Sequence, residues 1–130
     1  MSASPEWYEL LNHVAQRQFN EAADLLAANP SLRSAVNGIG ETVLHYQAVE
    51  NDERGVAWLK SKGFDINTRN EFGIPVVFEV AQLNYKDLLS WFISNGADMT
   101  CRDGEGQNIK EYLLDYENDD MMKHLESLGI

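Results

Sequence analysis

The stretch from residue 40 to residue 67 reads GETVLHYQAVENDERGVAWLKSKGFDIN, and its main features return 33 residues further along the chain. Six of the nine glycines lie in two registers with this period: Gly40, Gly73 and Gly106, and Gly63, Gly96 and Gly129. Apolar positions follow the same spacing: Leu11, Leu44 and Val77, and Leu26, Leu59, Phe92 and Leu125. Self-similarity at a fixed period of this length indicates a repeat architecture.

The pattern of each repeat predicts a pair of helices. After Thr42, whose hydroxyl suits a helix N-cap, apolar residues recur at helical spacing up to residue 50. A second apolar face follows over residues 56–59, and Gly63 then takes the position where a left-handed residue ends a helix. Turn-forming segments at 37–40, 70–73 and 103–106 separate the pairs. One such unit is too small to bury its apolar side, so we expect neighbouring units to stack.

Three segments resemble a known family. Residues 40–48, GETVLHYQA, resemble the G-x-T-P-L-H-x-A-A opening of ankyrin repeats, and residues 59–67 and 92–100 resemble the L-L-x-x-G-A-D-V-N segment. A period of 33 is also the ankyrin length. The resemblance covers about residues 4–130 and implies an all-α fold, an ankyrin-repeat solenoid of about four helix-turn-helix units with finger-like turns. We expect residues 1–130 to form a single domain, with units at about 4–36, 37–69, 70–102 and 103–130.

Two places depart from the family's pattern. The terminal units look like polar caps, since Lys110 stands where the inner units have Leu44 and Val77. Such caps keep an array from stacking end to end, so we expect a monomer when the protein is free. In the third unit, Pro75 comes one position early and Phe78 replaces the family's histidine. We expect that unit's first helix to start irregularly and the hydrogen bonds between its turn and the neighbouring turns to be disturbed.

Composition excludes several classes of partner. The 130 residues include 21 acidic and 10 basic side chains, which gives a formal net charge of −11. Nucleic acids and anionic membrane surfaces are bound mainly by Lys and Arg, so neither is expected as a partner. The sequence shows no apolar run long enough to span a bilayer and no signal-peptide pattern, and Cys101 is the single cysteine. These features predict a cytoplasmic protein in a reducing compartment.

Catalytic and metal-binding patterns are not found in the sequence. His13, His45 and His124 fall in three different units without metal-ligand spacing, so we expect neither a metal site nor another cofactor. The resemblance gives His45 a structural role, in which it ties neighbouring turns by hydrogen bonds. Cys101 has no base or orienting group beside it in the sequence. We therefore expect no catalytic residues and no enzyme activity.

The resemblance implies a binding surface. Ankyrin repeats hold protein partners with the finger tips and the exposed side of the first helices. The matching positions of this chain are Ile39, Glu41, Tyr46, Glu50, Glu71, Phe72, Ile74, Glu79, Gln82, Leu83, Glu105, Gln107, Asp115 and Tyr116. Ile39, Phe72 and Ile74 are apolar, although side chains at these positions normally face water. They either anchor a partner or pack against the adjacent fingers, and the sequence leaves both interpretations open.

Negative charge is concentrated in the last unit. Residues 103–130 carry eight acidic and two basic side chains, a net −6, whereas the first 102 residues carry −5. The acidic side chains that could form one acidic end are Glu105, Glu111, Asp115, Glu117, Asp119 and Asp120. Such an end would attract a partner with a basic surface. The alternative is a solvated cap that only keeps the protein soluble.

The function expected from these features is non-catalytic binding of another protein. Small acidic ankyrin proteins of this kind resemble immunity proteins, which neutralise a cognate toxin, often a cationic one. We therefore expect a protein-protein interaction module that binds and inhibits its partner through the finger turns and the concave helix face. The alternative is a regulatory or scaffolding adaptor that binds a cellular partner with exchangeable, micromolar affinity.

Overall fold

The computed structural model describes residues 3–130; Met1 and Ser2, which the predicted single domain includes, lie outside the described residues. The described residues form eight α-helices and one short 3₁₀ helix, and contain no β-strand. The elements are α1 (Pro5–Ala15), α2 (Phe19–Ala28), η1 (Pro30–Arg33), α3 (Val43–Val49), α4 (Glu53–Ser61), α5 (Val76–Gln82), α6 (Lys86–Ser94), α7 (Ile109–Leu114) and α8 (Asp119–Ser127). The predicted all-α class is confirmed.

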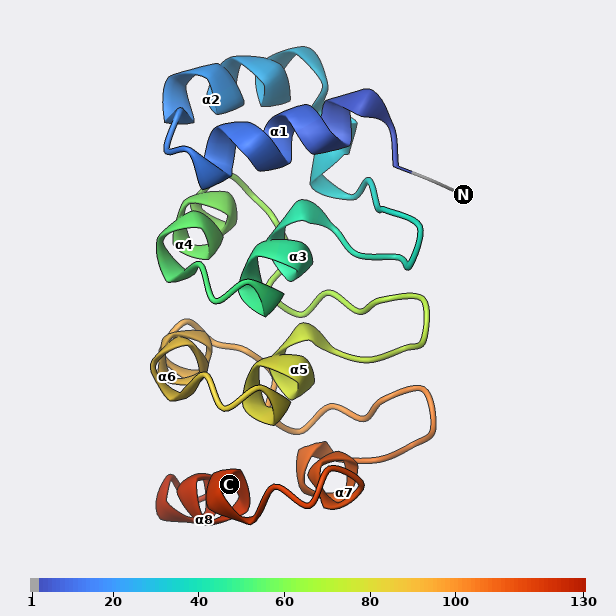
Figure 1. Cartoon of the computed structure of the whole chain (residues 1–130), viewed down its shortest axis with the longest axis vertical. Helices are drawn as coiled ribbons and strands as arrows, with labels where there is room; N and C mark the ends of the chain where they lie inside the picture. The colour runs from blue at the N-terminus through green and yellow to red at the C-terminus, as the bar shows by residue number, and fades with distance from the viewer. Residues whose placement is uncertain (1–2) are drawn as a thin grey trace.

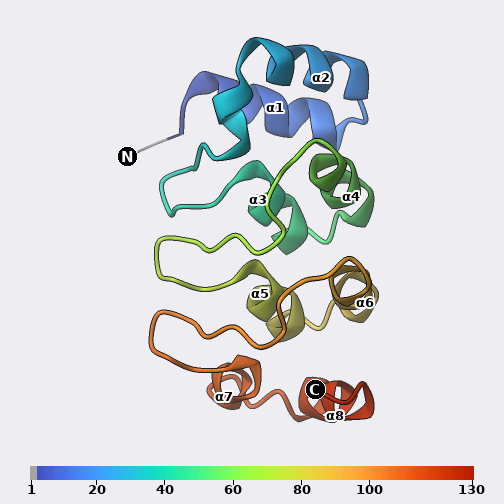
Figure 2. The same cartoon turned by 180° about the vertical axis from the view of Figure 1, so that it is seen from behind.

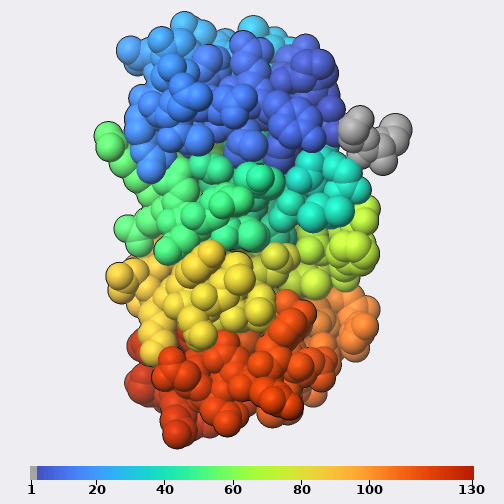
Figure 3. All heavy atoms as spheres, viewed as in Figure 1, coloured from blue at the N-terminus to red at the C-terminus, as the bar shows by residue number. Residues whose placement is uncertain are grey.

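The eight α-helices form four pairs. Figures 1 and 2 show these pairs stacked in one row along the longest axis of the molecule. Helices α3, α5 and α7 follow one another in one column, α4, α6 and α8 lie beside them, and the connecting loops project from the opposite side. Each helix packs against its partner in the pair, and α1, α3, α5 and α7 contact one another in that order. The space-filling view shows the same pairs as successive bands of colour in close contact (Figure 3).

Glycines bend the chain at two points of every repeat. The six glycines of the two registers all have positive φ, between 74° and 97°: Gly40, Gly63, Gly73, Gly96, Gly106 and Gly129. Because L-residues with a Cβ avoid this region, glycine is the residue that fits there. The left-handed helix ends predicted at Gly63 and Gly96 are confirmed.

The turn between the two helices of each pair also contains a left-handed residue, and this residue is not glycine. These residues are Arg17, Asn51, Asn84 and Glu117, with φ of 61°, 60°, 62° and 51°. Asn tolerates this conformation because its short polar side chain bonds locally, whereas Arg and Glu do so less readily. The turn that joins the two helices thus contains a left-handed residue in all four pairs, although the residue type differs.

The predicted irregular start of the third unit's first helix takes the form of a missing cap. Thr42 caps α3 by accepting a hydrogen bond from His45 N at 3.2 Å, and Asn108 caps α7 in the same register. Pro75 occupies this register in α5 and offers no side-chain acceptor. The predicted disturbance between the loops is wrong, since Glu71 N donates to Ile39 O at 2.9 Å and Gly104 N donates to Gly73 O at 3.1 Å. These are backbone bonds, which do not depend on the side chain at position 75.

We expect Asn108→Ala to lower the free energy of unfolding by about 1 kcal/mol, the usual cost of losing an N-cap. Asn108 and Glu111 form a reciprocal capping box, in which each side chain accepts a hydrogen bond from the other's backbone N–H. Urea denaturation followed by circular dichroism measures the change. Asn108→Asp keeps the capping oxygen and serves as the control. Equal stabilities of the alanine variant and the wild type would contradict the cap assignment.

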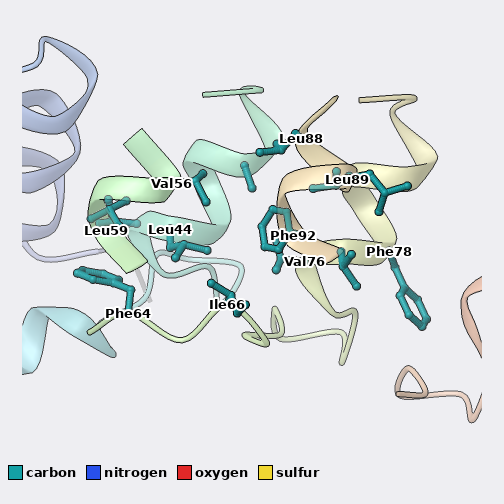
Figure 4. Close-up of a cluster of buried hydrophobic side chains, with 14 of the residues drawn as sticks. Leu44, Val56, Leu59, Phe64, Ile66, Val76, Phe78, Leu88, Leu89 and Phe92 are labelled. Atoms are coloured by element: carbon teal, nitrogen blue, oxygen red, sulfur yellow. The ribbon is translucent and has the colours of Figure 1, made fainter. Parts of the chain in front are cut away.

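The apolar core runs through the whole stack. Figure 4 shows side chains of adjacent helix pairs, among them Leu44 and Leu59 of one pair and Phe92 of the next, gathered between the helices. Phe78 is fully buried and its ring centroid lies 5.3 Å from that of Tyr112 in α7, so it joins the third pair to the fourth. Among the described residues, no helix has both the length and the apolar character needed to cross a bilayer.

Candidate functional site

The three long loops at 37–41, 70–74 and 103–107 are built in the same way. One side-chain oxygen at the start of each loop accepts two backbone N–H bonds, from the residues two and four positions further on. The side chains that do so are Asn37, Asn70 and Asp103. The residue two positions on therefore points outward, and Phe72 is the most exposed of these apolar tips at 63%, with Ile39 at 45%.

A pocket of about 190 Å³ lies between the second and third of these loops and helix α7. We call it the acidic–aromatic pocket; its lining residues are Phe72, Ile74, Asp103, Glu105, Gln107, Tyr112, Asp115 and Tyr116. Six of these residues belong to the predicted binding surface. Asp103 and Tyr112 were not predicted as site residues, although Asp103 begins a predicted turn and Tyr112 shares a repeat register with Glu79, a predicted surface residue.

The pocket carries three carboxylates and no basic side chain. Among residues 3–130, no Lys, Arg or His forms an ion pair with Asp103, Glu105 or Asp115. Asp103 Oδ1 accepts the two loop N–H bonds, and Asp115 Oδ2 lies 3.5 Å from the amide of Gln107. The other four carboxylate oxygens have no donor in the described part of the chain. The pocket therefore presents negatively charged carboxylate oxygens that accept no hydrogen bond within residues 3–130.

Aromatic rings also line the pocket. Tyr112 is 5% exposed, and its ring centroid lies 5.0 Å from that of Tyr116, which is 49% exposed. Burial, followed by the hydrogen bond with Tyr116, raises the pKa of Tyr112 well above its ordinary value. The Tyr112 hydroxyl donates to Tyr116 Oη at 3.4 Å. The site offers ring faces and hydroxyl groups beside its carboxylates.

A second hollow lies between the first two helix pairs and holds two further predicted residues, Tyr46 and Glu50. Tyr46 is partly buried, and its ring packs edge-on against Trp7 at 5.8 Å. The charge of this hollow is partly compensated, because Arg17 donates to both oxygens of Asp52 at 2.8 and 2.6 Å. Glu50 is its one carboxylate without an ion pair among residues 3–130, whereas the acidic–aromatic pocket has three.

Glu41 and Glu79, predicted as surface contacts, instead flank a buried histidine. Glu41 is 5% exposed, and His45 is fully buried, with Nε2 lying 3.0 Å from Glu79 Oε1 and 3.9 Å from Glu41 Oε2. One oxygen of each carboxylate also accepts a bond from an asparagine amide, that of Asn37 or Asn70, at 2.9 Å. The cluster ties two loops and two helix pairs together, which agrees with a structural role for His45.

The same cluster has a donor set that a divalent cation could use, since its three ligand atoms lie within 4.8 Å of one another. No sequence spacing could show it, because Glu79 comes from a different helix pair than Glu41 and His45. In the structure, Glu79 Oε1 is shared between the Asn70 amide and the histidine ring, and Glu41 Oε1 accepts a bond from the Asn37 amide. The two carboxylates thus have partners within the protein, whereas His45 Nδ1 is buried and has none among the described residues.

The remaining predicted residues are scattered. Ile39 and Glu71 lie on neighbouring loops and are exposed, whereas Gln82 and Leu83, at the end of α5, are half-buried. The predicted acidic end is partly neutralised, because Glu111 pairs with Arg102 at 3.3 Å and Asp120 pairs with Lys86 at 2.8 Å. The largest group of predicted residues that the structure brings together is the one in the acidic–aromatic pocket.

The sequence matches no model of a known protein family and no curated protein sequence. The candidate site is therefore defined by the geometry of this chain alone. Its strongest features are an exposed aromatic ring at a rigid loop tip and unpaired carboxylates in the adjoining pocket.

Proposed function

We propose that the chain is an ankyrin-repeat protein that binds another protein without catalysing a reaction, and that it inhibits that partner as an immunity protein inhibits its toxin. The 33-residue period, the stacked helix pairs and the projecting loops support the ankyrin assignment. The observation that carries the binding function is the acidic–aromatic pocket, with Phe72 exposed at its edge.

A protein partner suits this site better than the other classes of ligand. Exposed aromatic side chains within a polar surround are typical of binding hot spots, and carboxylates without cations repel phosphates. Phe72 is held outward by the Asn70 side chain, which bonds the backbone on both sides of it, so presenting the ring needs little ordering on binding. A basic surface on the partner would complement the net charge of −11.

We expect Phe72→Ala to weaken partner binding at least tenfold while leaving the melting temperature nearly unchanged, because the ring is 63% exposed. The tagged chain is first used to recover a stoichiometric partner from a native lysate of its source, and the affinities of the variants are then measured by titration calorimetry. Leu128→Ala, which removes an exposed apolar side chain just after α8, is the matched control and should bind as the wild type does.

The affinity separates inhibition from the adaptor role. An inhibitor should bind with a nanomolar or tighter dissociation constant, whereas exchangeable micromolar binding would favour the adaptor. Recovery of no stoichiometric protein partner would overturn the proposed function. A Phe72→Ala variant that loses stability but keeps its affinity would show that the ring packs against neighbouring loops.

A further inference from the structure

We propose that the acidic–aromatic pocket binds an arginine side chain of the protein partner. The inference deepens the proposed function by naming the group that this site recognises, and it rests on that function. It is carried by three observations: the unpaired carboxylates, the aromatic rings beside them, and the size of the pocket.

The carboxylates provide the first argument. Asp103, Glu105 and Asp115 line one small space, and among residues 3–130 none of them has a cationic partner. Four of their six oxygens have no hydrogen-bond donor in this part of the chain. Like charges that line one pocket repel one another, so a cation that enters the pocket relieves repulsion as well as gaining hydrogen bonds. A guanidinium offers five N–H donors, enough to reach several of these oxygens at once.

The aromatic rings favour arginine over lysine. A planar guanidinium stacks on ring faces while its edge donates to carboxylates, whereas the ammonium of lysine is a compact, strongly hydrated point charge. Phe72 and Tyr116 are both well exposed and line the same pocket as the three carboxylates. The chain already contains one such contact elsewhere, since Arg54 Cζ lies 5.7 Å from the ring centroid of Phe19.

The dimensions provide the third argument. A volume of about 190 Å³ is smaller than the roughly 300–1,000 Å³ of typical small-molecule sites, and it suits one long side chain. The walls are held in place before binding: the Asp103 side chain fixes its loop, and Tyr112 is buried against Phe78. A preformed pocket reduces the entropy lost on binding.

The direct test uses a small probe and the isotope-labelled chain. N-acetyl-arginine amide is titrated while backbone amide shifts are followed by nuclear magnetic resonance, with the citrulline analogue as a neutral probe of the same shape. We expect saturable shifts around Phe72, in the loop 103–107 and at residues 112–116. The dissociation constant should be at least tenfold weaker for citrulline and intermediate for N-acetyl-lysine amide.

Asp103→Asn is the most informative variant. Asn37 and Asn70 show that an amide oxygen holds this loop as well as a carboxylate does, so the variant removes one charge and keeps the fold. We expect it to weaken arginine binding at least threefold. Asp65→Asn is the matched control, because the exposed Asp65 also accepts a local backbone bond, from Asn67 N at 2.8 Å, but does not line the pocket. Its affinity for arginine should be unchanged.

Three results would overturn the inference: equal shifts with arginine and citrulline, shifts centred on other residues, or Ca²⁺ saturating the same amides and displacing the arginine probe. The last would make the pocket a cation site. Failure here is separable from failure of the proposed function, because the probe titration needs no partner. If a captured partner loses its affinity for the Phe72→Ala variant but keeps it for Asp103→Asn, the proposed function stands and the proposal of an arginine in the pocket is rejected.

Discussion

Replacing Gly40 by alanine should lower the free energy of unfolding by about 3 kcal/mol. Gly40 has a φ of 79°, and a left-handed conformation costs an L-residue roughly 1 kcal/mol or more. An added Cβ would also collide with the backbone nitrogen of Glu71 in the next loop, whose N–H donates to Ile39 O. Overlap of this kind typically costs a further 1–3 kcal/mol, roughly, because the backbone must shift.

Gly106→Ala is the matched control for this prediction. Gly106 has nearly the same φ, 80°, and occupies the same register, but an added Cβ would meet no atom within 4 Å. The variant should therefore show the backbone strain alone, about 1 kcal/mol. Urea denaturation of both variants gives the comparison. Equal losses in the two would show that the close approach of neighbouring loops does not contribute to stability.

Asp52→Ala should also be destabilising, by about 3 kcal/mol. Asp52 caps α4 through Gly55 N and accepts bonds from Arg17 and from Gln47 Nε2, so both of its oxygens have two donors. Loss of the cap costs about 1 kcal/mol, and loss of hydrogen bonds to a charged group costs about 1.5–3 kcal/mol. Because Arg17 belongs to the first helix pair and Asp52 to the second, the variant loosens the contact between them.

The pH dependence provides a check on this assignment. Burial alone would raise the pKa of Asp52, but the hydrogen bonds from Arg17, Gly55 and Gln47 outweigh it and hold the pKa below its ordinary value. The stabilisation is therefore complete above about pH 4 and is lost as the pH falls through the lowered pKa. The stability difference between wild type and Asp52→Ala should shrink accordingly in acid.

Asp52→Asn separates the cap from the ion pair. It keeps a capping oxygen and removes the charge, so it should lose less stability than the alanine variant. Arg17→Ala, combined with each Asp52 variant in a double-mutant cycle, measures the coupling to Arg17 directly. A difference between wild type and Asp52→Ala that stays constant from pH 7 to pH 2 would rule out an ionised Asp52 as the stabilising group.

The backbone conformation of the repeat could be predicted at the positions that glycine occupies. The two glycine registers give the helix ends and loop turns, because few other residues tolerate positive φ. The turn inside each helix pair could not be predicted in the same way, since Arg17 and Glu117 are compatible with an ordinary helix and yet have positive φ there. Pro75 suggested disturbed loops, yet the bonds between loops join backbone groups and persist.

The candidate site could be predicted in part. Phe72, Ile74 and Tyr116, which the repeat register assigns to the binding surface, line one pocket. It does not separate an exposed position from a buried one in the same loop, and Glu41 lies inward because the amide of Asn37 and the ring of His45 hold its carboxylate. Whether a carboxylate is paired or free depends on side chains from another unit, which a single sequence does not show.

The left-handed turn inside each helix pair also sets the order in which the stack opens. Asn51 and Asn84 hold the two middle turns with little strain, whereas Arg17 and Glu117 each carry a conformational cost of about 1 kcal/mol. Arg17 offsets this cost through its two bonds to Asp52, but Glu117 forms no ion pair within residues 3–130. The pair α7–α8 should therefore open most readily, and its amide protons should exchange with solvent before those of the middle pairs.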